Sequence, residues 1–260
     1  MKRTGARQAT AFFIGVVAGV GSGLVSLGGG TLVIPLLMGW LGMSPLNARG
    51  MAMAVSLFSA GAGASIYARH GMLDPPVAAW VAVPAFVLTP LFAKYSEHWS
   101  EARLKRGFGL VVAIGGLLVI FRDELTGDVS VPEAWQQAYL LLVGIVEGAI
   151  SGIIGISGGP VLAPLFVLGL GMPQQLAQGC SLAARLPAVV SGTWENARLG
   201  NIHWSLVPTL AAGGMLGAWG GSRLALALPE QQLRAGFGLL LIALGWHYLH
   251  GTAHRSHDKP

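Results

Sequence analysis

The 260-residue sequence is 53% hydrophobic and only 10% charged, whereas soluble domains carry roughly 25% charged residues. This composition excludes an ordinary water-soluble domain and indicates a protein embedded in lipid. The formal net charge of +5 does not indicate nucleic-acid binding, because the basic residues are scattered over loops and form no patch interleaved with aromatic residues. The single cysteine, Cys180, excludes an internal disulfide and a multi-cysteine metal site.

The first long apolar segment runs from Ala11 to Gly42 and is interrupted near its middle. As one straight helix it would be about 48 Å long, more than the roughly 30 Å hydrocarbon core of a bilayer requires. Ser26 and the glycines at 28–30 break it, since each glycine costs roughly 1 kcal/mol in a helix. We therefore expect two short helical pieces. The basic residues before Ala11 resemble a signal peptide, but no convincing cleavage site follows, so we expect this segment to remain in the membrane.

Three full helices are expected after the first break, and the same order returns in the second part of the chain. An acidic, turn-rich linker at 122–133 separates the two parts. The second break is Ser157-Gly158-Gly159-Pro160, and proline is well placed at the first position of a restarting helix. The expected full helices are 46–68, 76–94 and 104–121 in the first part, and 175–197, 205–226 and 231–249 in the second.

A shift of 129 residues (164 minus 35) lays the second part on the first without a gap, placing Pro35 on Pro164. The tetrapeptide Gly-Phe-Gly-Leu at 107–110 falls on an identical one at 236–239. Matches between single glycines are common in membrane helices, but a matched proline and a matched Gly-Phe-Gly-Leu tetrapeptide are not. We interpret 1–121 as a first transmembrane repeat with a short basic tail, 122–133 as an acidic linker, 134–250 as a second repeat and 251–260 as a polar C-terminal tail. Repeated halves are typical of secondary transporters.

Loop charge indicates how each broken pair lies in the membrane, because lysine and arginine concentrate in short cytoplasmic loops. If the pair is a re-entrant hairpin, the basic N-terminus, the basic loop at 94–106 and the basic tail share one side, opposite the acidic linker. If the pair is one broken span, the basic loop faces outside. We prefer three crossings plus a hairpin per half, which makes the repeats inverted and both termini cytoplasmic. Arg223 and Arg234 fit this scheme less well.

Both glycine breaks are candidate anion sites. The first N–H groups of a helix that restarts inside the membrane are unpaired, and the helix dipole adds partial positive charge there. The alternative is that glycines form small-residue seams between packed helices, which we prefer for the glycines at 15, 19, 23, 144, 148 and 152. The candidate substrate ligands at the breaks are Ser26, Gly28, Gly29, Gly30, Ser157, Gly158 and Gly159.

Two ionisable residues lie inside expected spans, where burial costs at least about 2.5 kcal/mol. Arg185 is near the middle of the helix 175–197, and Glu147 lies in the helix that leads to the second break. Their repeat counterparts are Ser56 and Ala18, so both features belong to one half only. We predict that Arg185 binds an anion, with a structural salt bridge to Glu147 as the alternative. Glu147 either forms that pair or carries a coupling proton.

A serine hydrolase is a competing hypothesis, because residues 155–159 match the G-x-S-x-G pattern with Ser157 as nucleophile. A catalytic serine needs a base within hydrogen-bond reach, and the candidates His203 and His247 lie near a loop and near a helix end. The sequence contains neither an H-E-x-x-H zinc motif nor a P-loop, and we expect no metal or cofactor. Catalysis is therefore the weaker alternative, beside a membrane assembly subunit that carries no solute.

Two segments carry a resemblance to a known family: GVGSGLVSLGGGTLVIPLL at 19–37 and GAISGIIGISGGPVLAPLF at 148–166. Each opens one half of the duplicated chain, and with them the sequence resembles the TauE/SafE family of sulfite and organic-anion exporters. The resemblance implies a permease for small anions such as sulfite, sulfonates or carboxylates. Ser157 stands where the first half has a glycine, so the two breaks are not expected to bind symmetrically.

The sequence thus predicts an all-α integral membrane protein with two inverted repeats, each a re-entrant hairpin plus three transmembrane helices. We expect a secondary, ion-gradient-coupled permease in a bacterial plasma membrane, because no nucleotide site is visible. The expected partners are a small anion and the lipid bilayer, and not nucleic acid. The sequence leaves open whether the protein forms a homodimer.

Overall fold

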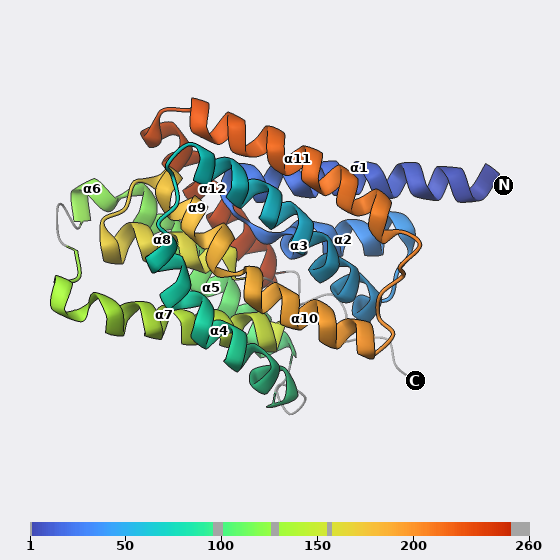
Figure 1. The fold of residues 1–260 in the computed structure, drawn as a ribbon, viewed down its shortest axis with the longest axis horizontal. Coiled ribbons are helices and arrows are strands. Elements are labelled where there is room, and N and C mark those ends of the chain that lie inside the picture. The colour runs from blue at the N-terminus through green and yellow to red at the C-terminus, as the bar shows by residue number, and fades with distance from the viewer. Residues whose placement is uncertain (1, 96–100, 126–129, 155–157, 251–260) are drawn as a thin grey trace.

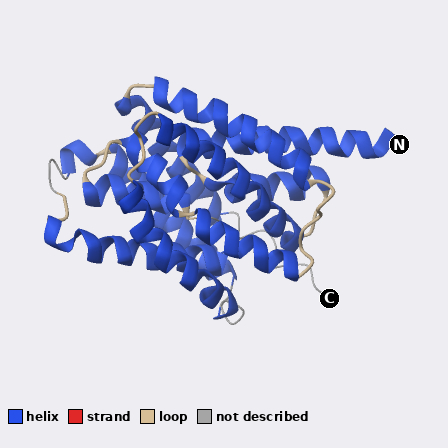
Figure 2. Cartoon of the chain, in the orientation of Figure 1, coloured by secondary structure: helices blue, strands red, loops and turns tan. Residues whose placement is uncertain are grey.

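A computed structural model describes residues 2–95, 101–125, 130–154 and 158–250, and every regular element within these ranges is a helix (Figure 2). The all-helical fold class is therefore confirmed. In chain order (Figure 1) the helices are α1 (Lys2–Val25), α2 (Gly28–Leu41), α3 (Pro45–Arg69), α4 (Pro75–Tyr95), α5 (Glu101–Ile120), α6 (Arg122–Leu125), α7 (Glu133–Ile154), α8 (Gly159–Leu170), α9 (Gln174–Ala184), α10 (Leu186–Arg198), α11 (Val207–Ala227) and α12 (Glu230–His250).

The outside of the helix bundle is apolar, as expected for a surface in contact with lipid. Four segments are long and apolar enough to cross a membrane by themselves: Gly5–Val25, Pro45–Arg69, Pro75–Phe92 and Glu133–Ile153. All seven tryptophans within the described residues have exposed side chains, and several lie at helix ends, where interfacial aromatic belts form. They are Trp40, Trp80, Trp135, Trp194, Trp204, Trp219 and Trp246. These features are those of a multi-pass membrane protein.

Several helix bounds of the two halves coincide under a shift of 129 residues (170 minus 41), although α4 and α11 (Val207–Ala227) are offset by three residues. Gly42 and Gly171, which this shift superimposes, both end a helix in the left-handed conformation, with φ of 61° and 67°. Side chains are strained in that conformation, which explains glycine at both positions. The coinciding bounds are the ends of α2 and α8 (Leu41, Leu170), the starts of α3 and α9 (Pro45, Gln174) and the starts of α5 and α12 (Glu101, Glu230).

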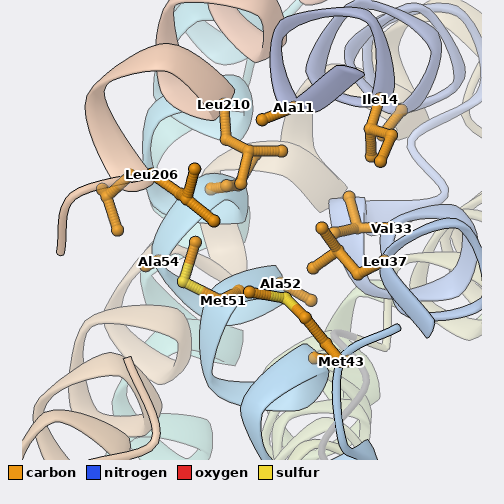
Figure 3. Packing of buried hydrophobic residues seen from close by; sticks show 14 of the residues in the cluster. Ala11, Ile14, Val33, Leu37, Met43, Met51, Ala52, Ala54, Leu206 and Leu210 are labelled. Carbon is orange, nitrogen blue, oxygen red and sulfur yellow. The ribbon is translucent and has the colours of Figure 1, made fainter. Parts of the chain in front are cut away.

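Each glycine break joins one long helix to one short helix. The helices α1 and α7 contain 24 and 22 residues, whereas α2 and α8 contain 14 and 12. The prediction of two short pieces is therefore wrong for the first arm, because neither a proline nor consecutive glycines precede Ser26 and the N-terminal residues join α1. The short arm folds back, so that Ile14 of α1 lies beside Val33 and Leu37 of α2 in one buried cluster (Figure 3).

The predicted helix 175–197 is in fact two helices, α9 and α10, which are separated at Arg185. Pro187 lies in the first turn of α10. Proline has no N–H to donate to the carbonyl of residue 183, and its ring crowds that carbonyl. The prediction of one uninterrupted helix is therefore wrong, and Arg185 lies at the junction of α9 and α10 with its backbone still in the right-handed helical region.

The two halves are packed into each other through their first helices. The helix α1 packs along α11 of the second half, and α7 packs along α4 of the first half. Gly15, Gly19 and Gly23 lie so close to α11 that a Cβ at each would collide with a backbone carbonyl of that helix. These glycines therefore form a small-residue seam, as the packing alternative predicts.

We expect Gly217→Ala to reduce the free energy of unfolding, because α11 presents this glycine to the seam. Its added Cβ would collide with the backbone of α1 near Val16 and Val20, and overpacking typically costs 1–3 kcal/mol. Gly220, one turn away on the same helix, has no neighbouring atom within 4 Å of an added Cβ. Gly220→Ala should therefore be neutral or stabilising by up to about 1 kcal/mol. Unfolding of both variants in detergent checks this, and equal stability would contradict the seam.

Candidate anion site

The two glycine breaks meet at a backbone contact between the halves. Ser26 follows the last residue of α1, and Gly159 is the first residue of α8. A Cβ on Gly159 would collide with the carbonyl oxygen of Ser26 and with the guanidinium of Arg185. Ser26 has a φ of 52° and is the only non-glycine residue with positive φ in the described part of the chain. That left-handed backbone conformation costs roughly 1–2 kcal/mol. The packing of Gly159 against the Ser26 carbonyl helps to hold Ser26 in it.

Arg185 is completely buried and binds the first break. Its Nη1 donates to the carbonyl oxygen of Ser26 at 3.1 Å, and its Nη2 donates to the hydroxyl of Ser22 at 3.0 Å. Its Nε has no hydrogen-bond partner among the described residues. The guanidinium therefore links the α9–α10 junction to the end of α1 and keeps one N–H available.

Polar side chains from α3 and α9 complete the surroundings of Ser26. Its hydroxyl lies 3.0 Å from the hydroxyl of Ser181 and 3.5 Å from the carbonyl oxygen of Gln178. The Tyr67 hydroxyl lies 2.9 Å from the carbonyl oxygen of Gly23 and 2.6 Å from Oε1 of Gln178. Because a tyrosine has one hydroxyl proton, it can donate to only one of these acceptors at a time. The network is therefore incompletely paired.

Glu147 is buried beside the second break and occupies the start of α8. Its Oε1 accepts hydrogen bonds from the Ser151 hydroxyl at 3.0 Å and from the Gly158 backbone N–H at 3.1 Å. A carboxylate is favourable at this position because the start of a helix carries partial positive charge. The sequence predicted an anion site at the second break. In this conformation the carboxylate of Glu147 occupies that position.

Arg185 and Glu147 lie on either side of the Gly158–Gly159 pair without touching. In the described residues no nitrogen of Arg185 is within 4.0 Å of an oxygen of Glu147. A Cβ on Gly158 would collide with Glu147, and one on Gly159 would collide with Arg185. The direct salt bridge considered as the alternative role of Arg185 is therefore not formed, and Oε2 of Glu147 also has no described partner.

This polar centre is closed to both sides of the protein. Ser22, Ser26, Ser181 and Arg185 have no exposed surface, and Glu147 is 1% exposed. A buried cation without a carboxylate in direct contact is costly unless a nearby charge or further hydrogen bonds compensate it, and Glu147 acts on Arg185 only from a distance. A small oxyanion is a chemically suitable further partner, because it offers several hydrogen-bond acceptors to the guanidinium and the hydroxyls.

The structure brings together most of the residues that the sequence predicted for the site. Ser26, Gly158, Gly159, Arg185 and Glu147 lie around one corner, and Gly28, Gly29 and Gly30 form the first turn of α2. Ser157 lies outside the described residues. The network of Tyr67, Gln178 and Ser181 was not predicted from the sequence. A signal was present, because Gln174, Gln178, Ser181 and Arg185 recur at the spacing of one helix face.

Comparisons with known proteins support a transporter. The sequence model of the family described as sulfite exporter TauE/SafE matches residues 1–119. A probable membrane transporter protein of Xylella fastidiosa (strain Temecula1) is 29% identical over 240 residues, which cover 88% of this chain and 90% of that protein. The probable membrane transporter protein YjnA of Bacillus subtilis is 24% identical over 246 residues, which cover 89% and 96%. The similarity to transporters thus extends over both halves.

The resemblance to the TauE/SafE family is therefore confirmed. Together with the apolar helices, these matches identify the chain as a multi-pass membrane transporter and not an enzyme.

Proposed function

We propose that this transporter carries a small oxyanion, such as sulfite, a sulfonate or a carboxylate, through a site between its two glycine breaks. The observation that carries the proposal is Arg185, a fully buried guanidinium with no carboxylate in contact among the described residues and with an unpaired Nε. A protein rarely buries an arginine in the membrane without a functional partner. The name of the matching family, a sulfite exporter, supports this class of substrate.

Glu147 supplies a means of coupling transport to a proton gradient. Its carboxylate lies against Gly158, next to the glycine that contacts Arg185. A substrate anion beside Arg185 and a charged Glu147 would repel each other, so anion binding and protonation of Glu147 favour one another. In this scheme the proton and the anion cross together, and no nucleotide is consumed.

Alternating access between inverted halves is the mechanism that fits this arrangement. In support, α1 begins at one end of the long axis of the molecule and α7 begins at the other (Figure 1). The equivalent helices α1 and α7 each pack against the opposite half. Because both breaks and Arg185 meet at one point, rocking of one half against the other would open that point to each side in turn.

Flux into proteoliposomes tests the proposed function. Purified protein should accumulate labelled sulfite, a short sulfonate or a simple carboxylate above the level of protein-free vesicles, with saturation at high concentration. A proton gradient should stimulate uptake, and Glu147→Gln should remove that stimulation. Flux of none of these anions under any imposed gradient would overturn the proposal.

The linker side is the side of the protein at which α7 begins, directly after the linker 122–133. We also expect this side to face outside in a bacterial plasma membrane, with both termini cytoplasmic. Ser130 and Ser205 are exposed and lie just before α7 and α11, helices that start at opposite ends of the long axis (Figure 1). In a Cys180→Ala background, Ser130→Cys should react with a membrane-impermeant thiol reagent in intact cells, and Ser205→Cys only after permeabilisation. Because the basic loops concentrate on the side of Ser205, reaction of both cysteines from one side would contradict the inverted topology.

A further inference from the structure

One face of α9 carries a continuous row of buried polar side chains. Gln174, Gln178, Ser181 and Arg185 are separated by four, three and four residues, which places them along one side of the helix. None of the four has any exposed surface. The eleven residue steps from Gln174 to Arg185 correspond to about 16 Å of helix. The row therefore reaches from the start of α9 to the centre of the candidate site.

Three members of this row have side-chain atoms without a hydrogen-bond partner, which distinguishes them from ordinary buried polar residues. Both amide atoms of Gln174, the Nε2 of Gln178 and the Nε of Arg185 have no partner in the described structure. A buried amide without partners is destabilising. The Gln174 amide is wholly unpaired, whereas Gln178 keeps the contact of its Oε1 with the Tyr67 hydroxyl. Partners of complementary chemistry at another stage of the protein's cycle would offset this cost.

A neighbouring face of α9, about a quarter of a turn away, is packed in the usual way. Ala177, Cys180 and Ala184 belong to an apolar cluster with Val81 and Phe166. The unpaired polar groups are therefore a property of one face and not of poor packing around the whole helix. This contrast provides a control on the same helix.

We propose that this face of α9 is the route by which the oxyanion passes between the linker side of the protein and Arg185. The inference rests on the proposed transport function and adds Gln174 and Gln178 as its contacts along the way. Oxyanion oxygens would supply the acceptors that the amide and guanidinium N–H groups lack. A positive charge lies near the Gln174 end of the row, because Arg122 donates to the carbonyl oxygens of Gly171 and Met172 at 2.9 and 3.4 Å.

Cysteine accessibility tests the route without any transported substrate. In a Cys180→Ala background, Gln174→Cys and Gln178→Cys should react with an anionic methanethiosulfonate added from the linker side, Gln174→Cys faster. Each should react at least tenfold faster than Ala177→Cys, and the natural chain, whose only thiol is Cys180, should stay as slow as that control. Because labelling needs no flux, a protein that moves none of the tested anions but shows this pattern would refute the proposed substrate and retain the route.

Gln174→Leu provides the second measurement. If Gln174 only fills space, an apolar side chain of similar size should keep both flux and thermal stability. If it lines the route, the variant should be at least as stable as the natural protein, because an unpaired buried amide is removed, yet lose anion flux at least tenfold. Gln175→Leu is the matched control, since Gln175 is only half-buried and donates to the carbonyl oxygen of Leu228. Flux of Gln174→Leu within twofold of Gln175→Leu, or equal labelling of Gln174→Cys and Ala177→Cys, would overturn the route.

Discussion

Replacing Arg185 by glutamine is expected to weaken anion binding by roughly 1.5–3 kcal/mol, or about ten- to 150-fold, the value typical of hydrogen bonds to a charged group. The guanidinium is fully buried, and its Nε is unpaired within the described residues. Glutamine keeps hydrogen-bonding capacity toward Ser26 but removes the charge. Equilibrium binding of sulfite to the purified variant in detergent measures the loss.

The control for this prediction separates a ligand role from a structural role. Arg185 and Glu147 are not in contact in the described structure. Glu147→Gln removes a repulsion and should change the affinity by a similar factor with either residue at position 185, so the loss caused by Arg185→Gln should remain. The single variant should also insert and purify like the natural protein. Recovery of both stability and binding in the double variant would indicate that Arg185 serves to neutralise Glu147. Unchanged affinity in a well-folded Arg185→Gln protein would remove Arg185 from the site.

A methyl group on Gly159 should strongly reduce transport, because this residue is where the two glycine breaks touch. The new Cβ would collide with the carbonyl oxygen of Ser26, a backbone atom that cannot move aside, and with Nη1 of Arg185. Overpacking of this kind costs roughly 1–3 kcal/mol, and it would displace Arg185 from Ser26. We expect flux of Gly159→Ala to fall more than tenfold.

Gly39 offers a matched control for this substitution. It lies in α2, the counterpart of α8, and has no atom within 4 Å of an added Cβ. Gly39→Ala should therefore keep full flux, and it should gain up to about 1 kcal/mol of helix propensity. Thermal melting and flux of the two variants should be measured side by side. Equal flux would show that the contact between the breaks is not needed for transport.

Much of the fold could be predicted from the sequence, because the physical signals are local and strong. The helices break beside the glycines at 28–30 and 158–159, as expected, and the expected helices 46–68 and 76–94 are long and apolar enough to cross a membrane. Pro187 was visible in the sequence as well, but the apolar run around it favoured one helix. The proline's missing donor and its steric clash outweigh hydrophobic continuity, so α9 and α10 separate at Arg185.

The candidate site was only partly predictable, because several of its residues are joined by contacts across the chain. Arg185 was identified as the charged residue nearest the middle of a span, but its bond to Ser26 joins positions 159 residues apart. The Tyr67 hydroxyl reaches Gln178 from a helix of the other half. Periodicity within one helix carries no information about such pairs. The contact of Glu147 with Gly158 is closer in sequence, but it depends on the turn of the break itself.

The most direct test of the account is to locate the bound anion. Selenite is a heavier analogue of sulfite, and its selenium atom gives an anomalous X-ray signal in crystals of the protein grown with it. The account predicts one strong selenium peak beside Arg185, with an oxyanion oxygen about 3 Å from Nε, and no such peak in Arg185→Gln crystals grown alike. A peak away from Arg185 and the two glycine breaks, or an equal peak in the Arg185→Gln variant, would contradict it.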